Sequence, residues 1–599
     1  MAIVPLARVT LCGPSADKEA VLAGLQDLGC CHLEGAPAHE QAGADRFLSP
    51  TAHRAFQYLA RCPNRRRQVL DPAGFHPRTV EAEALAIEER LRVLDEERDH
   101  LTMHIRALAP WGDFAFDDPF LLGELRLWFY IVPLYRLAEV AALDLVWQVV
   151  HQDGLDAYVV VIAGEEPQGL PVPRVHTGSR SLAELRQRLE EVEAEQEDLH
   201  WRRAGLTRWL SLFGQVLAAA DDAAALAEAL RLTSDQGGLF VLEAWSPEDR
   251  VGALAAFCRQ QGIVLVARPV EPGDRPPTLL ANEGVLAGGE LLVRFYTTPA
   301  YHLWDPSRLV AASFVLFFAM IVADAGYGLA LGLLWLAGRR RWGCRQPRLC
   351  QLAGLMILAT VGYGTLVGSY FGLPPPAGPL ASLVILDLTA RPAMMAVSVV
   401  IGAGHLLLGQ AINLARARTA GERLAAGGWI MILAGGLAAA GGWWQPAWTG
   451  LAAAGWPLLA AGSLTVLVFS SSRPFRQAGW RDLLGRLLDG ALALTNLSRA
   501  FGDVLSYLRL FALGLASAQL AMTFNELAAS ASRALPVLGS LVAAVIAVAG
   551  HSLNAGLAVM GGVIHGLRLN LIELFGWTLT DEGRSFQAFS RKEGKPWTL

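Results

Sequence analysis

An arginine inside an apolar stretch is the feature that most constrains this chain. The run 501–524 is long enough to span a bilayer, and it predicts one helix with Arg509 near its middle. Placing an arginine at bilayer depth costs roughly 2.5–3.5 kcal/mol on insertion scales. A water-filled cavity, an acidic partner or a passing charge must therefore offset that cost. The same stretch adds a polar track of Asp503, Ser506, Gln519 and Asn525.

A second arginine, Arg568, lies in the apolar run 554–573. Polar and small side chains precede it at intervals of three or four residues, so they share one helix face. Small residues on a face allow close approach of another helix. The face consists of Asn554, Ala558, Gly561, His565 and Arg568. Two such faces suggest a path for charge transfer; alternatively, the two arginines snorkel toward the helix ends or are bonded structurally.

Hydrophobic residues make up 53% of the 599 residues and are concentrated after residue 308, which is typical of a multi-pass membrane protein. The apolar spans are roughly 309–337, 349–372, 393–415, 424–443, 450–470, 487–525 and 535–575. The net charge of −5 and the lack of a basic tract give no support for a nucleic-acid partner.

The arginines between these spans predict the topology. They cluster in the connections 338–348, 416–423 and 473–486, which the positive-inside rule places in the cytoplasm. If the N-terminal half is also cytoplasmic, the span 309–337 must cross twice or form a re-entrant hairpin, breaking at Asp324. We therefore expect eight passages with both termini in the cytoplasm. Asp324 is expected to cap the break rather than carry protons, and His405 to be a hydrogen-bonded packing residue.

The N-terminal half carries two strand–helix–strand patterns. The first runs over 4–34 and the second over 239–268, and together they can form one sheet. A third pattern, with strands at 125–132 and 158–162, predicts a small separate lobe. We expect the seven cysteines to be reduced, as in a cytoplasmic compartment.

Two heptad patterns lie between these units. Apolar residues alternate in steps of three and four from Ala84 to Leu108 and again from Leu182 to Leu210. Two seams of similar length favour an antiparallel coiled-coil hairpin, with arms of roughly 40 Å at 1.5 Å per residue. The fold class is therefore mixed: α/β lobes joined by this hairpin, followed by an all-α membrane bundle. A generic dimerisation arm is the alternative for the hairpin.

The domain boundaries follow from these patterns. They are 1–75 (proximal lobe, first part), 76–110 (first coiled-coil arm), 111–177 (distal lobe), 178–218 (second arm), 219–305 (proximal lobe, second part, with a linker), 306–575 (transmembrane domain) and 576–599 (cytoplasmic tail).

The sequence gives no support for catalysis by this chain. Its single Gly-Lys pair, Gly594-Lys595, precedes a proline, so a phosphate-binding Walker loop is not formed there. No G-x-S-x-G or H-E-x-x-H motif occurs, and the cysteines have no zinc-site spacing. We predict no catalytic residue, no metal and no cofactor.

Two motifs carry a resemblance to a known family. The string Leu505-Ser-Tyr-Leu-Arg-Leu-Phe-Ala-Leu-Gly-Leu-Ala-Ser-Ala-Gln519, followed by His565-Gly-Leu-Arg-Leu-Asn-Leu-Ile-Glu573, resembles the a/I subunit of V-type and archaeal-type rotary ATPases. The Asp-Ala-Gly-Tyr-Gly element at 324–328 and the N-terminal patterns are similar as well, so the resemblance covers essentially the whole chain.

The resemblance implies a membrane stator subunit in a prokaryotic cell membrane. A ring of small subunits, each with a membrane carboxylate, would turn against this chain. Arg509 would keep each passing carboxylate ionised, since an adjacent cation lowers a carboxylate pKa by roughly 1–3 units, and would block proton leakage. Arg568 would be the second barrier group. Candidate half-channel or orienting groups are Gln519, His565, Glu573, Ser506 and Asp503.

The other implied partners are peripheral-stalk subunits at the cytoplasmic lobes, a central-stalk or ring-cap subunit, and the lipid bilayer. Two positions depart from the eukaryotic pattern: Ser517 replaces a histidine eight residues after Arg509, and Ala558 replaces a glutamate ten residues before Arg568. The half-channel residues of the eukaryotic relatives therefore cannot be assigned directly to positions of this chain.

Two other classes of function compete with this interpretation. A secondary transporter with a regulatory cytoplasmic domain would use the arginines as counter-charges for its substrate, although the inverted repeats common in transporters are not found between the halves of 309–575. A structural scaffold would merely pair them. A guanidinium of Arg509 sealed inside its own chain would exclude the rotary interpretation.

Overall fold

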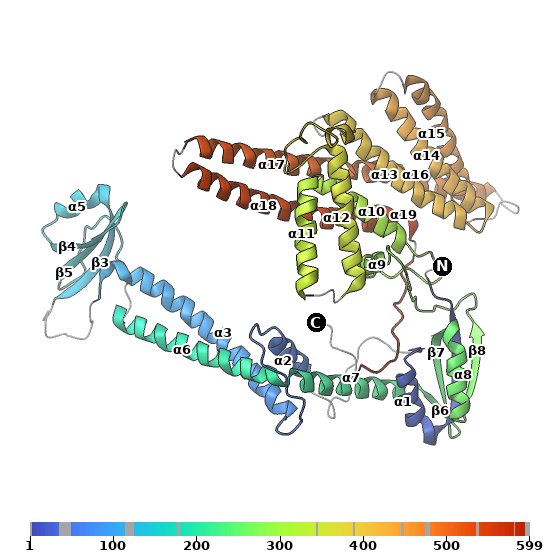
Figure 1. Cartoon of the computed structure of the whole chain (residues 1–599), viewed down its shortest axis with the longest axis horizontal. Coiled ribbons are helices and arrows are strands. Elements are labelled where there is room, and N and C mark those ends of the chain that lie inside the picture. The colour runs from blue at the N-terminus through green and yellow to red at the C-terminus, as the bar shows by residue number, and fades with distance from the viewer. Residues whose placement is uncertain are drawn as a thin grey trace. The chain divides into compact units, whose positions relative to one another are not determined.

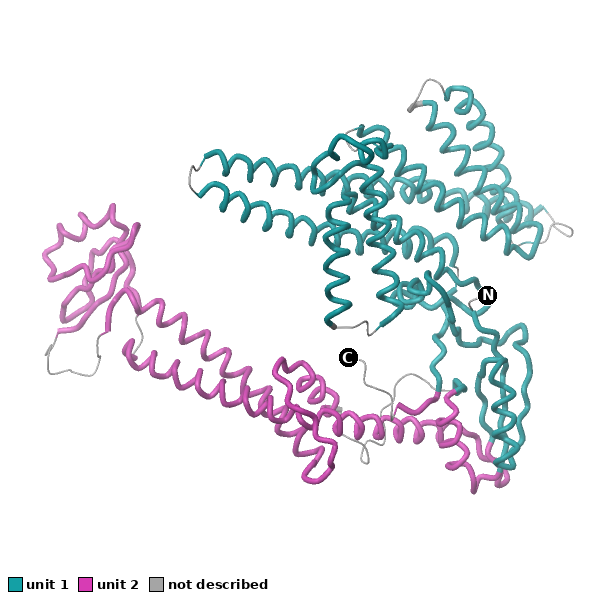
Figure 2. The backbone as a smooth tube through the Cα atoms, in the orientation of Figure 1, with its two compact units in different colours: residues 1–13, 30–34, 241–588 teal, residues 14–29, 35–240, 589–599 magenta. Residues whose placement is uncertain are grey.

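The computed structural model divides into two compact units, coloured separately in Figure 2. The first comprises 1–13, 30–34 and 241–588, and the second 14–29, 35–240 and 589–599. The structure describes residues 3–34, 50–113, 125–176, 180–342, 346–386, 390–444, 448–471, 473, 480–534, 538–579 and 581–592. Arg345 and Arg476, two of the arginines in the predicted cytoplasmic connections, lie outside the described residues.

Two long helices dominate the second unit (Figure 1): α3 (Pro77–Leu108) and α6 (Leu182–Leu206). Their buried apolar residues, including Ile87, Leu94 and Val192, share one core. Ion pairs join Glu83 to Arg202, Arg90 to Glu195 and Glu97 to Arg188. Because the residue number rises along one helix as it falls along the other, the helices run antiparallel.

The described residues of this unit also form a three-stranded sheet, a separate short strand and four further α-helices. The sheet has the order β3-β5-β4, with both pairs antiparallel. The sequence missed β4, an edge strand whose residues are mostly exposed. The bounds are β3 (Arg126–Pro133), α5 (Leu137–Ala141), β4 (Val146–Gln152), β5 (Asp156–Ala163), α1 (Lys18–Leu28), α2 (Pro50–Ala60), α7 (Leu210–Leu232) and β6 (Ser234–Gln236).

The first unit contains a second sheet, of order β2-β7-β1-β8. Strand β1 pairs antiparallel with β8, and β2 pairs antiparallel with β7. Strands from the two distant sequence patterns therefore alternate in one sheet, as the sequence predicted. The bounds are β1 (Leu6–Pro14), β2 (His32–Leu33), β7 (Leu239–Pro247), α8 (Val251–Gln260) and β8 (Val264–Pro269).

Long apolar helices make up the rest of the first unit. They are α10 (Ser307–Val322), α11 (Ala325–Trp342), α12 (Pro347–Val367), α13 (Arg391–Arg416), α14 (Ala420–Trp444), α15 (Thr449–Phe469), α16 (Trp480–Ser506), α17 (Leu508–Ala534) and α18 (Gly539–Arg568), with the short α9 (Gly289–Tyr296) before them and α19 (Phe575–Thr578) after. Among the described residues, seven helical stretches are long and apolar enough to cross a bilayer, or up to eight with the bent pair α10–α11 counted as one span. One of the seven, Leu182–Leu232, joins α6 and α7 of the other unit.

The helix break expected at Asp324 is present. Helices α10 and α11 meet at an angle of 119°. Ala323 ends α10 in the left-handed region, with φ of 48°. The Asp324 carboxylate, 2% exposed, accepts hydrogen bonds from the backbone N–H groups of Tyr327, Phe371 and Gly372 and from the Ser369 hydroxyl, at 2.6–3.0 Å. It therefore caps α11 and ties the break to the segment after α12.

The run 501–524 is not one helix, so that prediction was wrong. Helix α16 ends at Ser506 and α17 begins at Leu508. The fully buried Tyr507 lies at the junction, with its hydroxyl 2.7 Å from His405 Nδ1. A Cβ at Gly402 would lie 2.5 Å from the Tyr507 ring, so glycine is required there. As expected, His405 is a hydrogen-bonded packing residue.

Of the seven cysteines expected to be reduced, five are, one is not, and Cys344 lies outside the described residues. Cys12, Cys30, Cys31, Cys62 and Cys258 carry free thiols. Cys350, at the start of α12, is disulfide-bonded. Sequence spacing alone does not reveal which thiols the fold brings within bonding distance.

Candidate functional site

Arg509 lies in the first turn of α17 and forms an ion pair with Glu573. Its Nη2 donates to Glu573 Oε1 at 2.6 Å, and its Nε donates to the main-chain oxygen of Ser506 at 2.9 Å. The Arg509 side chain is 26% exposed, whereas the Glu573 side chain is 2% exposed. The acid is thus buried behind the arginine, and the guanidinium keeps an accessible edge.

Arg568 approaches the same carboxylate. Its Nε lies 3.9 Å from Glu573 Oε1, and its side chain is 50% exposed. Two guanidinium groups therefore share one carboxylate, which leaves one net positive charge on the cluster. In the described part of the chain, the second oxygen of Glu573 is buried without a hydrogen-bond partner.

A local change of helix type brings Arg568 and Glu573 together. In a regular α-helix, residues five apart point about 140° away from each other, given 3.6 residues per turn. Here α18 ends at Arg568 and continues as a π-helix over Leu569–Leu574. Bonding from i to i+5 in a π-helix brings such residues toward one side, and these turns are frequent at functional sites.

Buried polar contacts anchor the π-helix. Asn570 is fully buried, and its amide donates to the main-chain oxygen of Gly566 at 2.9 Å. The Ser313 hydroxyl of α10 donates to Asn570 Oδ1. These bonds hold the segment that presents Glu573, so the position of the acid is set by the bundle.

The two arginines leave the cluster with one excess positive charge. His565, one turn before Arg568 on α18, lies within electrostatic range of both arginines. The accessible side of the cluster therefore favours the approach of an anionic group.

Among the other predicted site residues that the structure describes, only Ser506 bonds to this cluster, through its main-chain oxygen and Arg509. Asp503 Oδ2 accepts a hydrogen bond from the Trp577 indole at 2.7 Å and lies 3.6 Å from Arg499. The Ser506 hydroxyl donates to the main-chain oxygen of Gly502. Gln519 is exposed and lies ten residues beyond Arg509, or roughly 15 Å along α17.

A second polar network lies farther along α17 and α18. The Tyr327 hydroxyl is 2.8 Å from His551 Nδ1, and His551 Nε2 is 3.0 Å from Asn525 Oδ1. The Asn554 amide donates to the Tyr327 hydroxyl at 2.9 Å and to the main-chain oxygen of Ser517 at 2.8 Å. Three helices, α11, α17 and α18, are joined in this way.

The sequence reasoning missed Tyr327 and His551. His551 lies three residues before Asn554, so the spacing that defined the polar face of α18 could have been extended to it. Nothing in the sequence pairs Tyr327 with that face, because the contact depends on how α11 packs. Within the described residues, no group of three or more His, Cys, Asp or Glu side chains could hold a metal ion.

Sequence comparisons find several relatives that are all named subunit I of an ATP synthase. No family model matches the chain. It is 28% identical over 426 residues to the V-type ATP synthase subunit I of Chlamydia pneumoniae, covering 58% of this chain and 60% of that protein. It is 26% identical over 452 residues to the A-type ATP synthase subunit I of Methanocaldococcus jannaschii, covering 69% and 64%.

The match to a third relative covers a larger share of both proteins than the first two matches do. The chain is 26% identical over 628 aligned residues to the V-type ATP synthase subunit I 1 of Treponema pallidum, covering 95% of this chain and 97% of that protein. The chain spans less than two-thirds of the length of the first two relatives. A solved structure of the cytoplasmic N-terminal domain of a V-ATPase subunit I matches with a TM-score of 0.20 and 17% identity, covering 44% of this chain and 100% of that one, a score too low to establish a shared fold. The sequence similarities make the chain a relative of subunit I of the V-type and A-type ATP synthases.

Proposed function

We propose that the chain is the membrane stator subunit of a rotary ATPase or ATP synthase, and that Arg509 and Arg568 form its ion barrier. The chain would translocate ions, most simply protons, against a ring of small subunits, while ATP chemistry takes place on other subunits. The observation that carries the proposal is the sharing of one buried carboxylate by two membrane arginines, which leaves an accessible net positive charge.

The barrier would act through this net charge. A carboxylate on the ring that arrives beside Arg509 would be favoured in its ionised form, because an adjacent cation stabilises the anion. Arginine suits this role, since its pKa above 12 keeps it charged even when it is partly dehydrated. Glu573 would hold the guanidinium in place without neutralising the pair of arginines. A free proton would be repelled by the same charge.

The half-channels would bring protons to and from this point. His565, beside the two arginines, and Gln519, on the exposed side of α17, are candidate groups along these paths. Ser506 would position Arg509 through its main-chain oxygen, and Asp503 would position the segment after Glu573 through Trp577. The polar network of Tyr327 and His551 offers further polar atoms near Ser517 and Ala558, where this chain departs from the eukaryotic pattern.

The remaining elements would give the stator its rigid link. We assign α3 and α6 to a coiled-coil hairpin between the proximal and distal lobes, with the boundaries predicted from the sequence. Eight passages would place the soluble half, both termini and the arginine-rich connections in the cytoplasm of a prokaryotic cell. Peripheral stalks would bind the lobes, and a central-stalk or ring-cap subunit would lie nearby.

The exposure of Arg509 bears on the rival functions. A scaffold that merely pairs its arginines needs one acid for each, and the cluster has one acid for two. A guanidinium sealed in its own chain would have excluded a rotor contact, and Arg509 remains 26% exposed. A transporter would use the same charge for a soluble anion, so an experiment must separate these two.

Replacing Arg509 in the assembled complex distinguishes a rotary stator from a transporter. Arg509→Gln and Arg509→Lys should assemble, yet ATP-driven acidification of reconstituted vesicles should fall at least a hundredfold, because the barrier charge is lost or can be titrated. Arg533→Gln is the matched control, since Arg533 is an exposed arginine of the same helix bonded to its own backbone. Normal pumping by Arg509→Gln would refute the proposal, and anion uptake without any coupled ATPase would favour a transporter.

A further inference from the structure

We propose that a groove along α13 and α14 binds one anionic phospholipid, with its headgroup at the arginine-rich end and its acyl chains at bilayer depth. This goes beyond the proposed function and requires only that these helices lie in a membrane. The groove comprises two cavities lined by the same pair of helices, one apolar and one polar.

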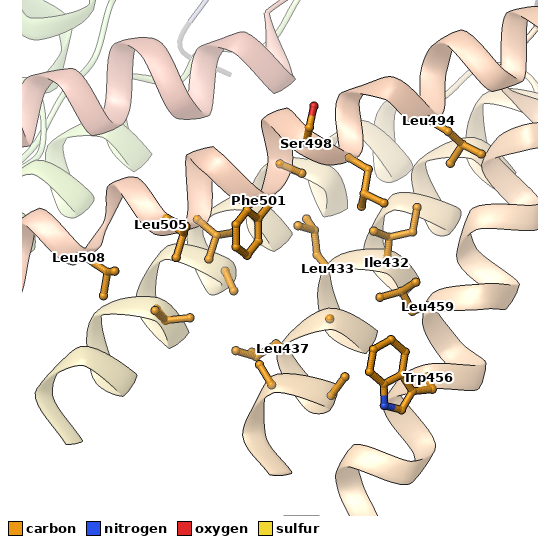
Figure 3. A pocket seen from close by; sticks show the side chains of 18 of the residues that line it. Ile432, Leu433, Leu437, Trp456, Leu459, Leu494, Ser498, Phe501, Leu505 and Leu508 are labelled. Carbon is orange, nitrogen blue, oxygen red and sulfur yellow. The ribbon is translucent and has the colours of Figure 1, made fainter. Parts of the chain in front are cut away.

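The apolar cavity has a volume of about 1100 Å³ and is lined by helices α13 to α17 (Figure 3). Its walls carry Leu433, Leu437, Trp456, Leu459, Phe501 and Leu505. Its two hydroxyl groups, on Thr495 and Ser498, donate to carbonyl oxygens of their own helix. The walls therefore offer an occupant little besides hydrocarbon contact, which suits an acyl chain.

The polar cavity has a volume of about 410 Å³ and lies where α13 ends and α14 begins. Arg416 and Arg418 line it, and Arg416 Nη2 donates to the main-chain oxygen of His302 at 3.0 Å, which fixes the guanidinium beside the cavity. Gln410 and Asn413 also line it, and the Asn413 amide donates to the main-chain oxygen of Trp577 at 2.9 Å and to Gln410 Oε1 at 3.4 Å, which leaves the arginines as its charged donors. Guanidinium groups bind phosphate through paired, charge-assisted hydrogen bonds.

The acids near this cavity leave it positive. Glu422 lines it, and its Oε2 accepts the backbone N–H groups of Arg418 and Thr419 at 2.9 and 3.4 Å, so it serves the start of α14. Asp581 lies 3.5 Å from His302 Nε2, outside the cavity lining. Two arginines against one lining carboxylate favour an anionic headgroup over a zwitterionic one.

The two cavities lie along the same faces of α13 and α14. On α14, Trp429 lines the polar cavity and Ile432, three residues later, lines the apolar one, a step of about 5 Å. On α13, Gln410 lines the polar cavity and Ala403, seven residues earlier, lines the apolar one. Residues three or seven apart share a helix face. Trp429, which is 9% exposed and packs edge-on against Trp577, lies at the boundary between the two cavities.

A bilayer lipid is the occupant that fits both ends. A partner helix would match the apolar part and leave the arginine end unsatisfied, whereas free phosphate would match only the polar part. The arginine-rich connections favour the cytoplasmic side, and the cytoplasmic leaflet is the anionic one. One phospholipid supplies a phosphate and two acyl chains in the required order.

Native mass spectrometry of the full chain, purified from nanodiscs that contain phosphatidylglycerol and phosphatidylcholine, tests the proposal. We expect about one retained phosphatidylglycerol per chain. The variant Arg416→Gln/Arg418→Gln should retain it about thirtyfold less, because each interfacial arginine adds about a fivefold preference for an anionic lipid. Gly436→Leu should lower the retention of both lipids, since a Cβ at Gly436 meets only Leu459, at 3.9 Å, and a larger side chain there extends into the apolar cavity.

The matched control is Arg340→Gln/Arg341→Gln, which removes two arginines at the end of α11. Equal loss in the control, equal retention of phosphatidylcholine, or binding of glycerol phosphate in place of a lipid would each overturn the proposal. The readout does not involve pumping, so its failure and a failure of the stator function are distinguishable.

Discussion

Two arginine–glutamate pairs in this chain have the same length and different surroundings. Arg509–Glu573 in the helical bundle and Arg90–Glu195 between α3 and α6 both measure 2.6 Å. The side chains of the first pair are 26% and 2% exposed, and those of the second 45% and 38%. Contact distance therefore says nothing about what each pair contributes.

The two pairs differ in how deeply their side chains are buried and in the number of arginines for each glutamate. Water screens Arg90 and Glu195, so their pair contributes little to stability. Glu573 is withdrawn from water, and removing either partner of a buried pair leaves a charge that nothing compensates. The α3–α6 pair is also one-to-one, whereas Glu573 faces two arginines. Two arginines with one glutamate keep an excess positive charge that can act on a third group. One arginine paired with one glutamate has no excess charge to do so.

The largest expected effect comes from removing the shared acid. Glu573→Gln should lower the free energy of unfolding by about 3–5 kcal/mol, because Arg509 then keeps its charge beside Arg568 without the buried partner. Thermal unfolding of the full chain in nanodiscs would measure the change. Asp503→Asn is a useful control, since its carboxylate accepts the Trp577 indole on the neighbouring segment without touching Arg509. A loss equal to that of the control would mean that Glu573 is no more than an ordinary hydrogen-bond acceptor.

The sequence could predict the two arginines and Glu573 as candidates, because charged residues in apolar runs are costly and therefore conspicuous. It also predicted the break at Asp324 from the distribution of arginines between the apolar spans, and the helix faces of the α3–α6 seam from spacing within each helix. It could not predict that all three charged groups meet. That meeting depends on the π-helix at 569–574 and on the helix break at Tyr507, and both are set by packing between helices.

The same limit explains the other misses. The pairing of Tyr327 with His551 joins residues 224 positions apart, and no local pattern signals it. Strand β4 was missed because apolar residues lie on both of its faces: Trp147 and Val149 pack against the core, whereas Val146 and Val150 are exposed. The alternation that marks a half-buried strand is therefore weak. Each of these missed features depends on contacts between elements, whereas the predicted features follow from patterns in the sequence.

A smaller effect on stability is expected at the second arginine. Arg568 is half exposed and 3.9 Å from the shared acid, so Arg568→Gln should cost no more than about 1 kcal/mol. It would nonetheless remove the excess charge and leave a matched pair like Arg90–Glu195. We expect ATP-driven pumping to fall at least tenfold with the melting temperature nearly unchanged. A variant that pumps normally would show that the number of charges at this site is irrelevant.

The smallest effect is expected in the exposed pair of the α3–α6 helices. The hydrogen bond from Arg90 lowers the pKa of Glu195 below its ordinary value of 4.5. A lowered carboxyl pKa contributes stability above that ordinary value and loses it as the pH falls through the lowered one. The melting temperature of Glu195→Gln should therefore differ from that of the unaltered chain only above about pH 4.5. The difference should be little more than the scatter between repeated measurements, because both side chains are screened by water. Raising the salt to about 1 M, where the Debye length is about 3 Å, should erase even that difference. A large, salt-insensitive loss would mean that this pair resembles Arg509–Glu573 after all, and that exposure is not what distinguishes them.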